Sequence, residues 1–217
     1  CEKYAYASPY CYCLDNPVNA VDYDGEQVFI LGTLSELALK QLQQQVGKDL
    51  CLYLAKDNNL CYEIYNRHLT NSAKKIIKMI DSKDIILNIE TRDSKYTSTG
   101  NLFVGGAFMG NNVVMDNNNN VKYVDAFQEI NPVVLERADM YSKPGTFIMH
   151  EITECYNGAL LSKKIKKSSP SSDKEGTMYK NAHNKATYQP AVLEHKTRKR
   201  QSKQNGMWQI LRTINIT

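Results

Sequence analysis

The sequence predicts an α+β fold, in which a small mixed or antiparallel sheet packs against helices. Apolar residues make up 42% of the 217 residues and charged residues 23%, a balance typical of a folded chain with a core. Short β-branched runs are followed by longer segments whose apolar residues recur at helical spacing. Turn-forming residues separate the segments. A chain of this length supports one main domain with appendages.

The first predicted elements are a strand, a helix and a hairpin. The apolar run 28–31 predicts a strand. Thr33 is expected to cap a helix over 34–46, because a glutamate stands at capping-box spacing and a glycine follows the last turn. Two strand-like runs, 50–54 and 60–65, flank a Lys-Asp-Asn-Asn turn and predict the hairpin.

The middle of the chain is predicted to add one helix and four strands. Isoleucines at helical spacing predict the helix over 72–80, and the β-branched run 84–90 predicts a strand. Two further strands are expected over 102–109 and 113–115. An asparagine-rich tight turn then leads into a strand over 121–124.

Two helices are predicted near the C-terminal end. Thr146 follows a Pro-Gly pair and is expected to cap a helix over 147–164. A loop with a proline at 168–173 then leads to a second helix over about 176–186.

Charge, hydropathy and cysteine patterns predict a domain without a membrane span or a zinc finger. The net charge of +4 comes from two basic clusters, one at 163–167 and one at 196–203. Such clusters are usually solvated, so nucleic-acid binding is the less favoured interpretation. No apolar run approaches the roughly 20 residues that span a bilayer, and no signal peptide opens the chain. The six cysteines contain no C-x-x-C pair with zinc-finger spacing.

The string His150-Glu151-Ile152-Thr153-Glu154 carries the main functional signal. It is an H-E-x-x-E motif, one residue type away from the H-E-x-x-H motif of zinc hydrolases. In a helix, His150, Glu154 and Gly158 share one face, while an apolar stripe occupies another. We expect the stripe to face the core and a further segment to approach Gly158, since glycine is unfavourable inside a helix.

These residues predict a divalent metal site, with zinc favoured. A catalytic zinc ion takes three protein ligands and leaves one position open. His150 and Glu154 supply two ligands, and His183, on the inward side of the next helix, is the preferred third ligand ahead of His195. Glu151 stands where H-E-x-x-H enzymes hold the base that takes a proton from metal-bound water. Because a carboxylate is a harder ligand than imidazole, other divalent metals also fit.

The remaining catalytic role falls to a tyrosine, and several alternatives stay open. Tyr156 or Tyr179 is expected to polarise a substrate carbonyl. In the simplest alternative, His150 and Glu154 form a helix-surface ion pair and His183 is a buried histidine with a backbone partner. Cys155 as a nucleophile ranks lower because it falls on the apolar stripe.

Two alternatives concern the function of the whole domain. One is a nuclease that uses His150, Glu151 and Glu154 around a divalent ion, with the basic tail holding phosphate. The other is a binding domain without catalytic activity.

Residues 8–25 read S-P-Y-x-Y-x-x-x-N-P-V-N-x-x-D-x-D-G and resemble the closing segment of the Rhs/YD-repeat core of polymorphic toxins. Tyr23 departs from the proline usual in the final D-P-D-G of that family. The resemblance implies the end of such a core at 1–26 and an effector domain at 27–195. The basic residues from 196 onward predict a separate tail at 196–217. The resemblance also implies a secreted effector, made in the cytoplasm, exported by a contact-dependent or type VI-like route and paired with an immunity protein.

A second resemblance covers about 40 residues around the motif. G-T-x-x-x-H-E-x-x-E-x-Y-x-G-A, followed by Y-x-x-A-H-N-x-A, is similar to Rhs-linked C-terminal domains from Bacteroides-type bacteria. Their helix resembles the active-site helix of zincin metallopeptidases. The resemblance implies hydrolysis of a protein or peptide substrate in a target cell. It departs from the zincin pattern at Glu154, where zincins have histidine.

Overall fold

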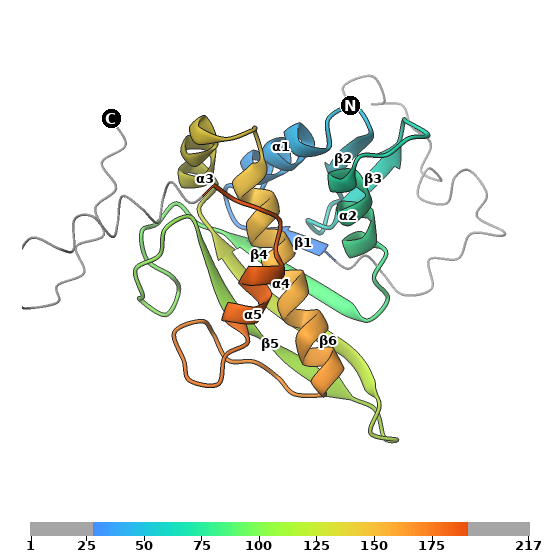
Figure 1. Ribbon diagram of the computed structural model, residues 1–217, viewed down its shortest axis with the longest axis vertical. Coiled ribbons are helices and arrows are strands. Elements are labelled where there is room, and N and C mark those ends of the chain that lie inside the picture. Colours follow the sequence, from blue (N-terminus) through green and yellow to red (C-terminus); the bar gives the residue numbers. More distant parts are fainter. Residues whose placement is uncertain (1–27, 191–217) are drawn as a thin grey trace, which may run out of the picture.

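The computed structural model describes residues 28–190, which form an α+β fold (Figure 1). Its larger sheet has the strand order β1-β4-β6-β5, and β1, β4 and β6 run parallel while β5 pairs antiparallel with β6. The strands comprise β1 (Val28–Leu31), β4 (Ile85–Thr91), β5 (Gly106–Met115) and β6 (Val121–Ile130). A separate hairpin joins β2 (Leu50–Leu54) to β3 (Leu60–Ile64). The predicted fold class and the mixed sheet are confirmed.

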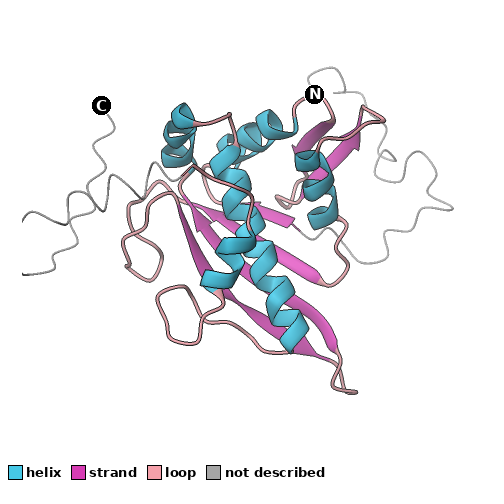
Figure 2. Cartoon of the chain, viewed as in Figure 1, coloured by secondary structure: helices cyan, strands magenta, loops and turns pink. Residues whose placement is uncertain are grey.

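Helices pack on one another and on the large sheet (Figure 2). The longest helix, α4, lies against β5 and β6, and the short helix α5 packs beside it (Figure 1). The helices comprise α1 (Ser35–Val46), α2 (Asn71–Ile80), α3 (Pro132–Ala138), the 3-10 helix η3 (Asp139–Tyr141), α4 (Thr146–Ile165) and α5 (Tyr179–Lys185).

The core lies between the sheet and α4. Side chains along β4 alternate between buried and half-buried, as expected for a strand covered on one face. Its buried residues share one apolar cluster with Ile148, Ile152, Cys155 and Ala159 of α4. The predicted apolar stripe of this helix therefore does face the core.

The first turn of α4 differs from the prediction, because Thr146 does not cap it. Gly145 is the N-cap residue, in a left-handed conformation, and Thr146 is the first helical residue. The carboxylate of buried Asp139 instead accepts hydrogen bonds from the backbone N–H groups of Gly145, at 2.6 Å, and Phe147, at 3.2 Å. Asp139, seven residues before Thr146, thus accepts from backbone N–H groups at the helix start that have no partner within the helix.

The start of α1 also differs. Leu34 rather than Thr33 is the N-cap residue and makes no side-chain cap. Its backbone N–H donates to the Thr91 hydroxyl at 3.1 Å, so β4 supplies the acceptor. The predicted stop at Gly47 is confirmed, with φ of 63° at that glycine.

One continuous strand, β5, replaces the two strands predicted over 102–109 and 113–115. Gly110, which reads as a break in the sequence, has φ of 92° and lies at a bulge where the register with β6 shifts. The loop after α4 covers the outer edge of β5. The backbones of Asn111 and Ser169 bond to each other, and Ser172 N–H donates to the Phe108 carbonyl.

Two smaller corrections concern helices. Helix α3 was not predicted, although Asn131 accepts hydrogen bonds from two N–H groups of the first turn and Pro132 follows it at the favoured position. α5 is shorter than predicted and spans Tyr179–Lys185. No helix among the described residues is long and apolar enough to span a bilayer. The Rhs-like segment, His195 and the basic tail lie outside the described residues.

Candidate metal site

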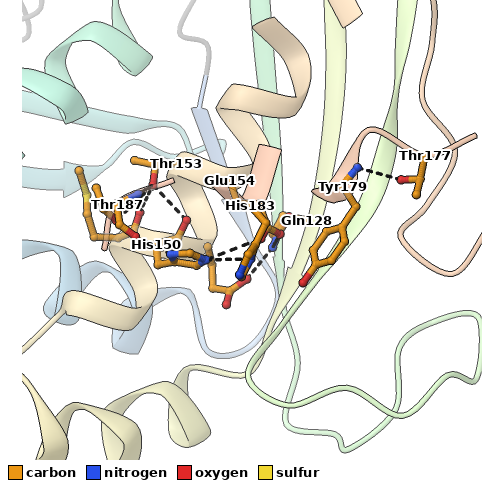
Figure 3. A network of polar contacts seen from close by, with 10 residues as sticks. Gln128, His150, Thr153, Glu154, Thr177, Tyr179, His183 and Thr187 are labelled. Carbon is orange, nitrogen blue, oxygen red and sulfur yellow. Dashed lines mark hydrogen bonds and ion pairs between the residues drawn. The ribbon is translucent and has the colours of Figure 1, made fainter. Parts of the chain in front are cut away.

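Three side chains predicted as ligands meet between α4 and α5. His150 and Glu154 come from successive turns of α4, and His183 from α5 (Figure 3). His183 Nδ1 lies 2.6 Å from Glu154 Oε2 and 3.1 Å from His150 Nε2. His150 Nε2 lies 3.7 Å from the same Glu154 oxygen. These three residues can hold a metal ion.

The separations fit a single small cation. Ligand atoms bound at about 2.0–2.1 Å around a tetrahedral ion lie about 3.3 Å apart, and the three observed separations bracket that value. Two imidazoles and one carboxylate also form a ligand set that catalytic zinc sites use. The donor atoms of the described residues therefore fit a divalent metal ion.

A hydrogen bond on the side of His150 away from His183 determines which ring nitrogen carries the proton. Nδ1 lies 2.5 Å from the backbone carbonyl oxygen of Thr187, which can only accept. Nδ1 must therefore carry a proton, and in the neutral ring Nε2 bears the lone pair that faces His183 and Glu154. His183 Nδ1 faces both this lone pair and Glu154 Oε2, so either a proton on that nitrogen or a metal ion between the three atoms can link them. A backbone carbonyl behind a histidine is the usual support for a metal ligand.

Burial sets the electrostatics of this cluster. His150 is 3% exposed and Glu154 is 2% exposed. Burial favours the neutral carboxyl, but the neighbouring His150 and His183 side chains outweigh it and lower the pKa of Glu154. Burial likewise favours neutral imidazole, yet the Glu154 and Glu151 carboxylates outweigh it and raise the pKa of His150. The protonation states of His150 and Glu154 therefore depend on each other.

Glu151 lies beside this cluster and is linked to it by Gln128 of β6. The Gln128 amide nitrogen donates to Glu151 Oε2 at 2.7 Å and approaches Glu154 Oε1 at 3.3 Å. Burial, followed by the charge of Glu154, raises the pKa of Glu151 to about 8. A cation held by the three ligands would oppose that shift, because opposite charge stabilises the carboxylate.

Gly106 of β5 gives the Glu151 carboxylate its space. A Cβ at this position would lie 1.8 Å from Glu151 Oε2 and 2.0 Å from its Cδ. A glycine is therefore required where the edge strand passes the carboxylate. Gly158 plays the expected part on α4, since a Cβ there would lie 2.5 Å from the Phe108 ring. The predicted close approach at Gly158 is confirmed.

The structure contradicts the alternative in which His150 and Glu154 form an ion pair on the helix surface. His150 and Glu154 are both buried, and the partner of His183 Nδ1 is the Glu154 carboxylate rather than a backbone group. The His183 side chain is 27% exposed, so the cluster has one side turned toward solvent.

The two candidate tyrosines lie in different places. Tyr179 of α5 packs against the His183 ring, with ring centroids 5.4 Å apart (Figure 3). Tyr156 belongs to the core cluster, where burial raises the pKa of its hydroxyl above the ordinary value. The structure thus brings Tyr179, but not Tyr156, into contact with a predicted ligand.

The remaining candidates are separated from this cluster or inert. Burial raises the pKa of the Cys155 thiol well above its usual value, which keeps it protonated and unreactive. His68 is exposed on the surface, as expected. Gln128, Gly106 and Thr187 were not predicted, because a single glutamine, glycine or threonine carries no motif of its own.

Comparisons with known proteins add no family assignment. No protein-family model, curated protein or solved structure matches this chain.

Proposed function

We propose that this protein is a metal-dependent hydrolase that cleaves peptide bonds, with zinc held by His150, Glu154 and His183. The convergence of three ligand atoms beside the buried Glu151 carboxylate carries the proposal. A divalent cation supplies a Lewis acid that polarises a carbonyl oxygen and lowers the pKa of water. Two imidazoles and a carboxylate favour zinc, and the single carboxylate leaves room for manganese or iron.

Residues around that ion have separate roles in the proposed reaction. Glu151 is the general base, since it is adjacent to a proposed ligand and a cation at the site would favour its ionised form, which can accept a proton. Gln128 holds the Glu151 carboxylate through one hydrogen bond. The exposed side of His183 leaves an approach for substrate, and Tyr179 beside it is better placed than Tyr156 to contact a carbonyl.

The nuclease alternative lacks comparable support among the described residues. Lys163 pairs with Asp84, and Lys166 donates to the Asn119 carbonyl at 2.9 Å. Lys163 follows His150 by thirteen residues along α4, which is about 20 Å along the helix axis. The cluster at 163–167 therefore does not hold phosphate at the proposed ligands, and the basic tail to which the nuclease alternative assigns that role lies outside the described residues.

The biological setting that we propose follows the resemblance of residues 8–25 to an Rhs core. The chain is then an effector of a polymorphic toxin, exported after synthesis in the cytoplasm and delivered into a target cell. Its partners are a protein substrate, an upstream Rhs shell and a cognate immunity protein.

Replacing the proposed base tests the function. Glu151→Gln keeps the shape of the side chain and its contact with Gln128 but removes the base, so casein cleavage by the zinc-loaded protein should fall at least about 100-fold. Zinc content should stay at the wild-type level, because Glu151 is not a ligand. Wild-type cleavage by Glu151→Gln contradicts the role of Glu151. Cleavage of single-stranded DNA or RNA, with casein left intact, replaces the peptidase with the nuclease.

A further inference from the structure

We propose that Thr153 is a positioning residue that selects the ring nitrogen of His150 presented to the ion. Thr153 lies on α4 between His150 and Glu154 and is 5% exposed. Its hydroxyl contacts the segment after α5 at the residue whose carbonyl supports His150 (Figure 3). The consequence for metal binding rests on the proposed function, whereas the contact itself does not.

The hydrogen-bonding capacity of the Thr153 hydroxyl is fully used. A hydroxyl has one proton to donate and two lone pairs. The proton points to the helix carbonyls of Met149, at 2.8 Å, and His150, at 3.0 Å. The lone pairs face the Thr187 backbone N–H at 3.0 Å and the Thr187 hydroxyl at 3.2 Å.

The bond from Thr187 N–H distinguishes this threonine from an ordinary helical one. A threonine inside a helix commonly donates to the carbonyl four residues earlier, and that bond contributes little. Here the same oxygen also accepts from a residue 34 positions later in the chain. It fixes the backbone of Thr187 against α4, next to the ligand helix.

Fixing Thr187 determines the tautomer of His150. The Thr187 carbonyl accepts from His150 Nδ1 at 2.5 Å, and this acceptor keeps the proton on Nδ1 and the lone pair on Nε2. If the Thr187 backbone moves away, Nδ1 loses its acceptor and the ring is free to carry its proton on Nε2. A ring in that form offers no lone pair toward Glu154 and His183.

The test compares Thr153→Val with Thr153→Ser. Valine keeps the branched shape but removes the hydroxyl, while serine keeps the hydroxyl. In metal-free protein, above the pKa of the ring, ¹⁵N NMR should show His150 protonated on Nδ1 in wild type and Thr153→Ser. In Thr153→Val a substantial share of the proton should move to Nε2. Thr153→Ala removes the same hydroxyl and replaces the valine variant if that variant does not fold.

Zinc titration of the same proteins gives the second readout. Thr153→Val should bind zinc about 10–100-fold more weakly than wild type, as for loss of other groups that orient a ligand, and Thr153→Ser should stay near wild type. Unchanged nitrogen shifts in Thr153→Val overturn the inference. A changed tautomer with wild-type zinc affinity overturns its role at the metal site. If wild type binds no zinc, the proposed function fails, and the nitrogen shifts alone decide whether Thr153 positions His150.

Discussion

The carboxylate of Glu151 is held between a glycine and an amide. On one side, the carboxylate lies so close to Gly106 that a Cβ at that position would clash with it. On the other side, the Gln128 amide donates a hydrogen bond to it at 2.7 Å. Gln128 is 1% exposed, and its amide oxygen has no hydrogen-bond donor among the described residues. A buried acceptor of this kind costs free energy unless a donor such as a water or a substrate N–H reaches it.

Gly106→Ala is predicted to displace the Glu151 carboxylate without touching a metal ligand. Casein cleavage by the zinc-loaded variant should fall by about 10-fold or more, because small misplacements of a reacting group are costly. Zinc content should be unchanged. Glu151→Asp in the same background withdraws the carboxylate by one methylene and should recover part of the loss. Full activity in Gly106→Ala contradicts the described position of Glu151.

The sequence predicted the three residues of the cluster but not the residues that hold them. The H-E-x-x-E spacing predicted His150 and Glu154 on one helix face, and the apolar neighbours of His183 at helical spacing predicted its inward position. The structure brings all three together. Gln128 and Thr187 could not be found in this way. Each reaches the ligands through a strand or loop pairing, and such pairings depend on register rather than on local pattern.

At the scale of elements, α4 is buried on two faces. Its apolar stripe packs into the core, and its polar face, with His150 and Glu154, is covered by β5, β6 and α5. The periodicity predicted the first face, because apolar residues mark it. The second face carries polar side chains, and its burial depends on partners that local sequence does not specify.

Gly158→Ala tests the close packing of α4 on β5. Alanine gains about 1 kcal/mol in helix propensity, but its Cβ would lie 2.5 Å from the fully buried Phe108 ring. Overpacking of this kind costs about 1–3 kcal/mol, so the free energy of unfolding should stay level or fall by up to about 2 kcal/mol. Urea denaturation measures it.

A smaller side chain at position 108 should reverse the effect of Gly158→Ala on the free energy of unfolding. In a Phe108→Leu background, Gly158→Ala should stabilise the protein by up to about 1 kcal/mol, because the contact with the ring is gone. The same destabilisation in both backgrounds would show that Phe108 is not the obstacle.

At the scale of the whole molecule, a hairpin and helix distant in sequence from the ligands are tied together by Asp49. Its carboxylate accepts from the Thr70 backbone N–H at 2.7 Å and from the Asn66 amide at 3.0 Å. These bonds join the start of β2 to the start of α2. They lower the pKa of Asp49 below its ordinary value of 3.8.

Asp49→Asn should therefore remove a contribution to stability that depends on pH in a defined direction. Because the folded-state pKa is lowered, ionised Asp49 stabilises the fold above pH 3.8, and this contribution is lost as pH falls through the lower folded value. The difference in unfolding free energy between wild type and variant should be constant near neutrality and shrink below pH 3.8. A difference that grows with acidity contradicts the assignment. Zinc content should be the same in both proteins.

Metal content tests the central claim most directly. Purified wild-type protein, dialysed against metal-free buffer after exposure to zinc, should retain one equivalent of zinc per chain. His150→Ala and His183→Ala should each lose it, because two ligands hold the ion poorly. His68→Ala, which changes an exposed histidine outside the site, should retain it. Absence of metal from wild type, or its full retention in His150→Ala, would contradict the account.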